Sequence, residues 1–341
     1  MIPPHLSVPP DRSNDARGSS EPQHCSGSIS LWDFVRWRLT HRQSADQPPV
    51  QPVPSLPITQ PQAPSPEALS PPQAEQFTWL GHSSVLVQLA GKTVWIDPVL
   101  SDRIGRVIRR RSPLGLRAEA LPPPDLLLIT HNHRDHLDEP TVRQLPRTTR
   151  VIVPPGLGSW FCRRGFNEVD ELRWWEQCLV GPLEITSVPA CHWSRRTPWD
   201  TNHTGWCGFV LRLTGVEPVP QSQGLPHGRS LYHAGDTGWF EGFQEIGNSF
   251  PNLDVVLLPV GGYEPAWLMG RHHLNPEQAG EAFRAINGRI LVPIHWGTFP
   301  LSDEPPDEPI RRLQTWWDQH PSHDGRRLMI PAVGTPLAIP P

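Results

Sequence analysis

From Phe77 to Trp296 the sequence alternates between short apolar runs, rich in Val, Ile and Leu, and polar or glycine-containing turns. Such runs are typical of buried strands. The stretch 77–100 predicts two antiparallel strands about the Ala90-Gly91 turn, and the later runs are DLLLIT, RVIVP, LEITSVPA, GFVLRL, SLYHAG, DVVLLPV and RILVPIHW. The clearest helix runs from Pro276 to Ala285, with Asn275 as N-cap and Gly288 near its end. Many strands with interspersed helices predict a mixed α/β domain.

Proline divides the chain into two parts. The 341 residues include 44 prolines, which crowd the segment before Phe77, where the composition cannot bury enough apolar surface to offset the ordering entropy. We predict a proline-rich arm over residues 1–76 and a folded domain over residues 77–341. Within the arm, ISLWDFVRWRLTHR (29–42) predicts a short amphipathic helix. It either lies on a membrane surface through its Trp and Arg side chains or docks on the domain, which a short helix favours because it needs tertiary support.

Composition narrows the classes of function and the compartment. The formal charge of −4, with a pI near 6.5, gives little support to a nucleic-acid partner. No apolar run is long enough for a membrane span or a secretion signal, so we expect a cytoplasmic protein, with membrane contact peripheral at most. The five cysteines are odd in number and form no CxxC pair, which predicts mostly buried, reduced thiols rather than a disulfide framework or a thiolate zinc site.

The chemistry is concentrated in ITHNHRDHLD, which follows a predicted strand. His131 and His133 alternate, so both can face one side of an extended segment, whereas Asp135 and His136 follow the turn and can face a second ion. One metal rarely accepts four ligands from six consecutive residues, so the spacing predicts two metals. Imidazole and carboxylate ligands without thiolates suit zinc, with manganese or iron as substitutes.

Three further candidate ligands end or follow predicted strands: His192, Asp236 and His295. Singly, each is more often a packing or turn residue. Together they complete a coherent set, in which His131, His133 and His192 bind one ion, Asp135, His136 and His295 bind the other, and Asp236 bridges the two.

This ordered set resembles the metallo-β-lactamase superfamily. The motifs TWLGHSSVLVQ, IDPVLSDR, HNHRDHLD, PACHWSRR, AGDTG, LPVGGYEPAWLM, HLNPEQA and IHWGTF resemble, in that order, the branch of N-acylphosphatidylethanolamine-hydrolysing phospholipase D and its bacterial relatives. The resemblance implies a four-layer αβ/βα sandwich, a binuclear zinc hydrolase that cleaves a phospholipid or related phosphodiester, and a homodimer. Arg134 departs from the branch, which commonly has an aromatic residue there, and the segment Gly215 to Arg229 looks like a local insertion.

Roles follow for residues around the metals. Two cations lower the pKa of a shared water and supply a nucleophile, which Asp135 could also orient. Asp97 is a candidate acceptor for a ligand histidine, or simply a turn residue. His273 matches the family position of an active-site histidine that serves the leaving group, or it caps the next helix; His272 is the alternative if the register is off by one. His82 matches a family motif without a defined role, whereas His203 and His233 are expected to be packing or surface residues.

The substrate side of the site is less determined by the sequence. Arg195 and Arg196 either contact a phosphate or are solvated, and the tryptophans beside the motifs (Trp193, Trp199, Trp206, Trp239, Trp267) either line an acyl-chain groove or pack the core. Two rivals to the phosphodiesterase are a lactonase of the ascorbate-6-phosphate kind, which should lack GGYEPAWLM and IHWGTF, and a non-catalytic metal-binding scaffold. The complete set of seven ligands argues against the scaffold.

Overall fold

A computed structural model describes residues 28–29, 32–33, 36–37, 75–105, 107–112, 114, 121–214, 229–321 and 325–340. Most of the predicted proline-rich arm and residues 215–228 of the predicted insertion lie outside these ranges, and the boundary between arm and domain stays a prediction. Among the described helices, none has the length and apolar character that crossing a bilayer requires.

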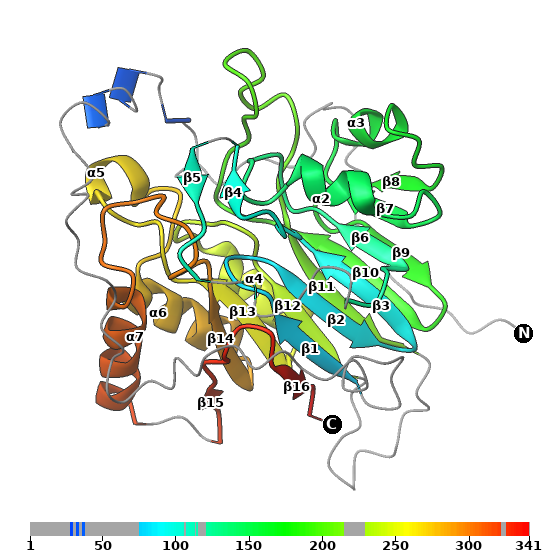
Figure 1. The fold of residues 1–341 in the computed structure, drawn as a ribbon. Helices are drawn as coiled ribbons and strands as arrows, with labels where there is room; N and C mark the ends of the chain where they lie inside the picture. Colours follow the sequence, from blue (N-terminus) through cyan, green and yellow to red (C-terminus); the bar gives the residue numbers. More distant parts are fainter. Residues whose placement is uncertain are drawn as a thin grey trace, which may run out of the picture.

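Two seven-stranded sheets form the centre of the fold (Figure 1). The first has the order β16-β1-β2-β3-β6-β7-β8, with bounds β16 (Pro336–Ala338), β1 (Gln76–Trp79), β2 (Val85–Leu89), β3 (Lys92–Ile96), β6 (Leu126–Leu128), β7 (Arg150–Val153) and β8 (Val169–Glu171). The second has the order β15-β14-β13-β12-β11-β10-β9, with bounds β15 (Arg327–Leu328), β14 (Ile290–Ile294), β13 (Val255–Pro259), β12 (Ser230–His233), β11 (Gly208–Leu213), β10 (Leu183–Val188) and β9 (Gln177–Val180). A separate pair, β4 (Arg103–Ile104) and β5 (Ile108–Arg109), forms a small ribbon.

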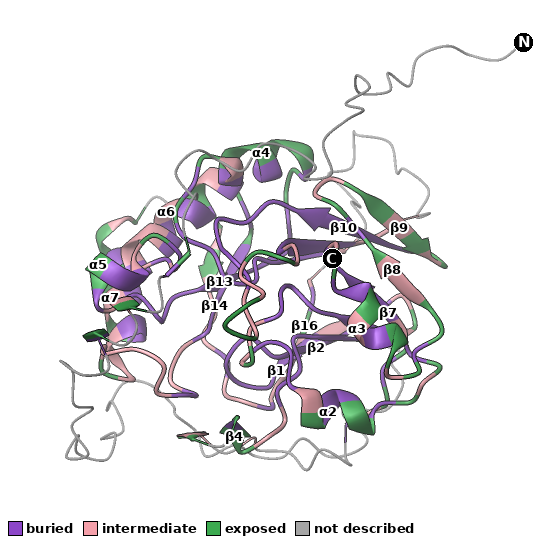
Figure 2. Ribbon diagram, turned by 90° about the horizontal axis from the view of Figure 1, so that it is seen from above, coloured by how far each residue is buried: buried purple, intermediate pink, exposed green. Residues whose placement is uncertain are grey.

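Helices cover the outer face of each sheet, which makes four layers. α4 (Gly242–Ser249), α6 (Pro276–Ile286) and α7 (Glu308–Gln319) share a hydrophobic core with the second sheet, and α2 (Glu139–Gln144) and α3 (Gly158–Cys162) share one with the first. A third core lies between the sheets and draws side chains from both. Figure 2 shows the result, with buried central strands and helices that are exposed only on their outer sides. This is the predicted αβ/βα sandwich.

Strand direction brings the carboxyl ends of several strands to one edge of the second sheet. β10 and β12 are each antiparallel to β11, and β12, β13 and β14 are parallel to one another. These four strands therefore point the same way. The loops that follow β10, β12 and β14 carry His192, Asp236 and His295, so the predicted ligands meet at this edge.

The long strands and the best-capped helix were predicted correctly. β2 and β3 pair antiparallel about Ala90 and Gly91, whose positive φ angles of 58° and 69° suit a two-residue hairpin turn. Asn275 forms the expected capping box with Gln278 at the start of α6, and the helix ends at Asn287, which is in the left-handed conformation directly before Gly288. The sequence missed β4, β5, β8, β9, β15 and β16, which are short and lack a clear apolar pattern, and it predicted two strands over residues 77–100, where the structure has β1, β2 and β3.

The described N-terminal residues pack on the domain. Ile29 and Trp37 are buried in a cluster with Trp193 and two side chains of α5 (Ala266–Met269), and the Trp37 indole donates a hydrogen bond to Asp303 at 2.9 Å. Figure 1 shows these helical pieces in blue beside α5. For the residues that are described, docking is thus the observed arrangement.

The cysteines differ in part from the prediction. Cys207 is buried, but Cys178 is half-buried and Cys162 is exposed, and all three are free. Cys191 is disulfide-bonded, so the expectation of reduced thiols is wrong there; Cys25 lies outside the described residues. A disulfide is typical of an oxidising compartment, and the cytoplasmic location stays a prediction.

Candidate metal centre

The structure brings all seven predicted ligands together. Their side chains belong to overlapping groups whose donor atoms lie within 4.8 Å of one another: His131, His133 and His192; His82, Asp135, His136 and His295; and His131, His136 and Asp236. The first four ligands in the sequence lie in the loop between β6 and α2, on the first sheet, and the other three follow strands of the second sheet. The centre therefore spans both halves of the sandwich.

The first group has the spacing of ligands to one ion. His133 Nδ1 lies 2.8 Å from His131 Nε2 and 3.2 Å from His192 Nε2. Ligand nitrogens at about 2.0–2.1 Å from a tetrahedral zinc are about 3.3 Å apart. Three imidazole nitrogens that converge in this way, with His131 and His192 buried, fit a metal site.

Asp236 connects this group with the second one. Its Oδ2 atom lies 3.1 Å from His136 Nε2 and 3.2 Å from His295 Nε2, and 3.8 Å from His192 Nε2 and 4.0 Å from His131 Nε2. Asp135 Oδ2 lies 3.7 Å from His136 Nε2 and 3.8 Å from His295 Nε2. One carboxylate oxygen thus faces nitrogens of both groups, which is the arrangement expected of a bridging ligand.

Several donor atoms of this cluster lack a regular partner. Among the described residues, His136 Nε2, His295 Nε2 and Asp236 Oδ1 are buried without a hydrogen bond of good geometry. The two nitrogens lie 3.1 and 3.2 Å from Asp236 Oδ2. Buried polar atoms are rarely left unsatisfied, so these converging lone pairs fit a pair of cations.

Burial and the two carboxylates shift the pKa values of the histidines in the centre. Burial lowers the pKa of His133 to about 4 and lowers that of His131 and His192 well below the usual value. Burial acts the same way on His295, but the carboxylates of Asp236 and Asp135 outweigh it and raise the pKa of His295 to about 9. Protons attracted by these carboxylates occupy the place where a cation would bind, since metal ligands must give up their protons.

Asp97 orients two of the ligand histidines. Its Oδ2 accepts a hydrogen bond from His136 Nδ1 at 2.7 Å and from the Thr130 hydroxyl at 2.6 Å, and Thr130 Oγ1 in turn contacts His131 Nδ1 at 2.9 Å. Its Oδ1 accepts from the Thr130 backbone N–H at 2.8 Å. Asp97 is fully buried, so it lies where the sequence placed an acceptor for a ligand histidine.

We expect Asp97→Asn to weaken metal binding by about 10–100-fold, as is usual when a partner of a ligand histidine is lost. Asp97 has φ 45°, which Asn tolerates better than most residues, so the variant removes the charge with little backbone strain. The measurement is a competition titration against a chelating dye. Asp125→Asn, which changes a carboxylate that bonds to Thr93 N, is the matched control; equal affinities in the two variants would contradict the role of Asp97.

Backbone carbonyls hold two other ligands, which sequence reasoning could not foresee. His192 Nδ1 lies 3.1 Å from the carbonyl oxygen of His272, and His295 Nδ1 lies 3.2 Å from that of Gly261. The loop after β13 is braced in turn by Glu304, which accepts from Gly262 N at 2.6 Å and Glu264 N at 3.1 Å. Glu304 therefore acts on the centre from outside it.

His82 is buried beside the centre, where it contacts Asp135 and His295. Its Nε2 lies 3.0 Å from Asp135 Oδ2, and its ring lies 4.0 Å from that of His295. Burial, aided by His295, lowers its pKa to about 3, so the neutral imidazole can donate its N–H to Asp135. His82, Asp97 and His295 all have positive φ, at 52°, 45° and 61°, a conformation that is uncommon outside glycine and collects at functional sites.

His273 lies at the edge of the metal cluster. Its Nδ1 is 4.0 Å from Asp236 Oδ2, and its side chain is 12% exposed, whereas His272 is buried. Gly262 packs against it so closely that an added Cβ would come within 3.2 Å of His273 Nδ1. Burial lowers the pKa of His273 to about 3, so the ring faces the centre as a neutral imidazole. His273, not His272, is thus the one open to a substrate.

The two arginines after His192 are engaged by the protein itself. Arg196 donates to the carbonyl oxygens of Asn132 at 3.2 Å and Leu137 at 2.8 Å, which lie within and directly after the stretch that carries the first four ligands. Arg134 donates to the Arg196 carbonyl at 3.3 Å. Arg195 lies 4.8 Å above the Trp193 ring and donates to the Ile29 carbonyl at 3.4 Å. Arg196 therefore supports the metal-binding loop rather than facing outward toward a phosphate.

Of the five tryptophans beside the motifs, two are buried and three are exposed. Trp193 is buried, and its ring lies 4.7 Å from that of His133; Trp206 is buried and donates to the Ala190 carbonyl. Trp199, Trp239 and Trp267 are exposed. His233 is buried and bonded to Ser83 O, and His203 is exposed, as predicted.

Comparisons with known proteins agree on the family. The beta-lactamase superfamily domain model matches residues 92–296. The chain is 34% identical to N-acyl-phosphatidylethanolamine-hydrolyzing phospholipase D 1 of Caenorhabditis elegans, over 66% of this chain and 64% of that protein. It is also 34% identical to the mitochondrial enzyme of the same name from Saccharomyces cerevisiae, over 70% of this chain and 52% of that protein. The chain thus spans between half and two thirds of these relatives.

Other relatives and solved structures extend this picture. A UPF0173 metal-dependent hydrolase of Methanopyrus kandleri is 31% identical over 70% of this chain and 91% of its own. The isothiocyanate hydrolase from Delia radicum gut bacteria has the same fold, with a TM-score of 0.60 at 20% identity over 77% of this chain and 99% of its own. So does CmlA, a diiron β-hydroxylase from Streptomyces venezuelae, with a TM-score of 0.57 at 21% identity over 78% of this chain and 54% of its own. The chain therefore belongs to the metallo-β-lactamase superfamily, among its metal-dependent hydrolases, in the branch that contains the N-acylphosphatidylethanolamine-hydrolysing phospholipases D.

Proposed function

We propose that this chain is a binuclear zinc phosphodiesterase of the phospholipase D type, acting on N-acylphosphatidylethanolamine or a related phosphodiester. The observation that carries the proposal is the position of Asp236 Oδ2, within 4.0 Å of nitrogens from both histidine groups. The similarity to the worm and yeast enzymes supports the substrate class. Manganese or iron remain substitutes for zinc, because the same ligands suit them.

The proposed ligands form two sets of three that share Asp236. His131, His133 and His192 would hold one ion, Asp135, His136 and His295 the other, and Asp236 both. When bound, such a pair activates water and offsets charge on phosphoryl oxygens. The protein's own groups orient the ligands: Asp97 and two backbone carbonyls hold the imidazole rings, and His82 holds Asp135.

The reaction adds water across the phosphorus–oxygen bond that joins phosphatidate to N-acylethanolamine. An oxygen from water bonds to phosphorus, the bond to the ethanolamine oxygen breaks, and that oxygen takes up a proton. His273 is the protein group beside the centre that is placed to meet the departing oxygen, and as a neutral imidazole it would do so through an N–H hydrogen bond.

Product analysis tests this proposal. Zinc-loaded protein is mixed with vesicles containing N-acylphosphatidylethanolamine, and the products are identified by mass spectrometry, with chelated protein as the blank. We expect phosphatidic acid and N-acylethanolamine. Fatty acid or diacylglycerol as the product would place the cleavage at another bond. Turnover only of a lactone panel would favour the lactonase, and absence of any turnover by metal-loaded protein would favour a scaffold.

Peripheral membrane contact, a homodimer and the absence of a nucleic-acid partner complete the proposal. Exposed tryptophans would suit contact with a lipid surface: Trp32 is 82% exposed and Trp267 is 55% exposed. The ring of Trp267 lies 5.7 Å from the guanidinium carbon of Arg36, which adds a cation suited to anionic head groups.

A further inference from the structure

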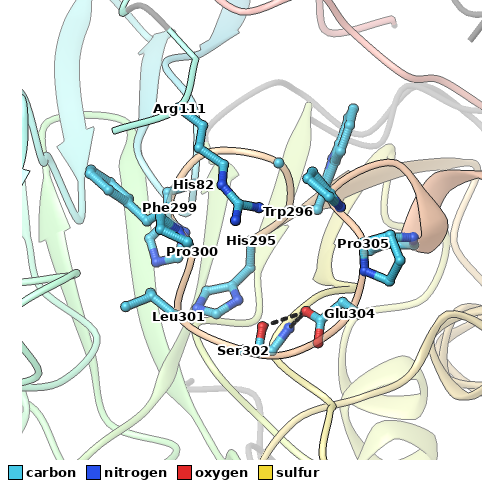
Figure 3. A pocket seen from close by; sticks show the side chains of 14 residues that line it. His82, Arg111, His295, Trp296, Phe299, Pro300, Leu301, Ser302, Glu304 and Pro305 are labelled. Atoms are coloured by element: carbon cyan, nitrogen blue, oxygen red, sulfur yellow. Dashed lines mark hydrogen bonds between the residues drawn. The ribbon is translucent and has the colours of Figure 1, made fainter. Parts of the chain in front are cut away.

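A pocket opens beside the metal centre, on the side of His82 and His295 (Figure 3). Its remaining walls come from Gly262, which packs on His273, and from the segment that follows β14. The lining residues include Arg111, Trp296, Phe299, Ser302 and Glu304. The space inside its walls is about 20 Å³, which is room for about one water or one small polar group.

The backbone beside the pocket is firmly held. Arg111 N donates to the Thr298 carbonyl at 2.7 Å, and His82 N donates to the Thr298 hydroxyl at 2.7 Å. His295 N donates to the His82 carbonyl at 2.9 Å. Arg111 is thereby anchored to the same segment that positions two of the imidazoles in the metal cluster.

The two charged side chains of the pocket are in different situations. The Glu304 carboxylate accepts hydrogen bonds from Gly262 N, Glu264 N and the Ser302 hydroxyl, so most of its acceptor sites are used within its own loop. The exposed Arg111 side chain has no hydrogen bond with any described residue, although the Glu304 carboxylate attracts its charge, and Figure 3 shows the guanidinium directed into the pocket above His295. The neighbouring Arg110 instead donates hydrogen bonds to the carbonyl oxygens of Leu80 and Val99.

A guanidinium without a hydrogen-bonded partner, beside the two proposed metal sites, suits one kind of ligand atom. Its donors form a planar fork that pairs with two oxygens of a phosphate, and negative charge builds on those oxygens as a nucleophile adds to phosphorus. We propose that Arg111 binds a non-bridging oxygen of the substrate phosphodiester and so determines the preference of the centre for anionic over neutral esters. The inference rests on the proposed phosphodiesterase.

The test compares two small substrates that share a leaving group: bis(4-nitrophenyl) phosphate, an anion, and 4-nitrophenyl acetate, a neutral ester. Arg111→Met should lower kcat/KM for the diester by about 10–100-fold, the effect of a lost hydrogen bond to a charged group. Arg111→Lys, which keeps the charge but loses the fork, should recover part of that loss. Arg109→Met, at an exposed position on β5, is the matched control. The neutral ester should change by less than about twofold in every variant, since it offers no anionic oxygen.

Binding of inorganic phosphate to metal-loaded protein, followed by calorimetry, gives a second readout. We expect Arg111→Met to bind phosphate at least about 10-fold more weakly than the wild type or Arg109→Met. Equal phosphate affinity in all three proteins, or an equal fall on both substrates together with lost metal, would overturn the assignment. If the wild type cleaves no phosphodiester, the proposed function fails, and the phosphate titration alone then decides the role of Arg111.

Discussion

Replacement of Asp236 by Asn is expected to lower hydrolysis by at least about 10³-fold, which corresponds to roughly 4 kcal/mol of lost transition-state stabilisation. The wild-type carboxylate faces His136 and His295 at 3.1 and 3.2 Å and the other histidine group at 3.8 and 4.0 Å. An amide keeps the shape but removes the charge that two cations would share. It also turns an N–H₂ group toward one side of the cluster, where only a lone pair can bind metal.

The measurement is metal content by mass spectrometry alongside the initial rate. We expect two ions per chain in the wild type and one or fewer in Asp236→Asn, with a parallel loss of rate. Asp102→Asn changes an exposed carboxylate and should keep both ions. Two retained ions with an unchanged rate in Asp236→Asn would remove the bridging role.

Replacement of His273 by Gln is expected to lower kcat by about 10²–10⁴-fold, the usual range for loss of a group that serves proton transfer or its electrostatic equivalent. His273 is 12% exposed at the edge of the cluster, and its Nδ1 is buried without a hydrogen bond among the described residues. It is not needed to complete the two proposed ligand sets. The metal content should therefore stay at two ions per chain while turnover falls.

A leaving-group series separates this role from a structural one. With the better leaving group of a 4-nitrophenyl diester, the penalty of His273→Gln should shrink, because a more acidic alcohol needs less help to depart. If His273 had a purely structural role, His273→Gln would give the same penalty for every leaving group. If His273 were an additional metal ligand, the variant would lose metal. His203→Gln, at an exposed loop position, is the control.

The sequence predicted those features that its local patterns encode. Leu126–Leu128 and Ile290–Ile294 are apolar runs long enough to be recognised as strands, and a predicted ligand follows each within three residues, His131 in the first case and His295 in the second. Asp97 was predicted in the same way, because it directly follows Lys92–Ile96. By contrast, the two-residue strands β4 and β15 are too short to show a periodicity, and β15 pairs with β14, which is remote in sequence.

The sequence could not show where a side chain points in the folded protein or which backbone groups it contacts. Arg110, Arg111 and Arg196 look alike as letters, yet Arg110 and Arg196 are satisfied by carbonyl oxygens inside the fold and Arg111 is not. The carbonyl groups that orient His192 and His295 belong to His272 and Gly261, and a backbone acceptor leaves no mark in a sequence. Glu304 acts through Gly262 N and has no motif of its own.

The division of the ligands between the two sheets gives the metals a mechanical part in the molecule. His131 to His136 belong to one half of the sandwich, whereas His192, Asp236 and His295 belong to the other, so bound ions would fasten the halves together as cross-links do. An ion that binds only the folded chain adds about 4 kcal/mol of stability at a free concentration 1,000 times its dissociation constant. The melting temperature of this fold would then depend partly on the free metal concentration. Removal of the metal would weaken the contact between the two halves of the sandwich at the edge where the ligands lie.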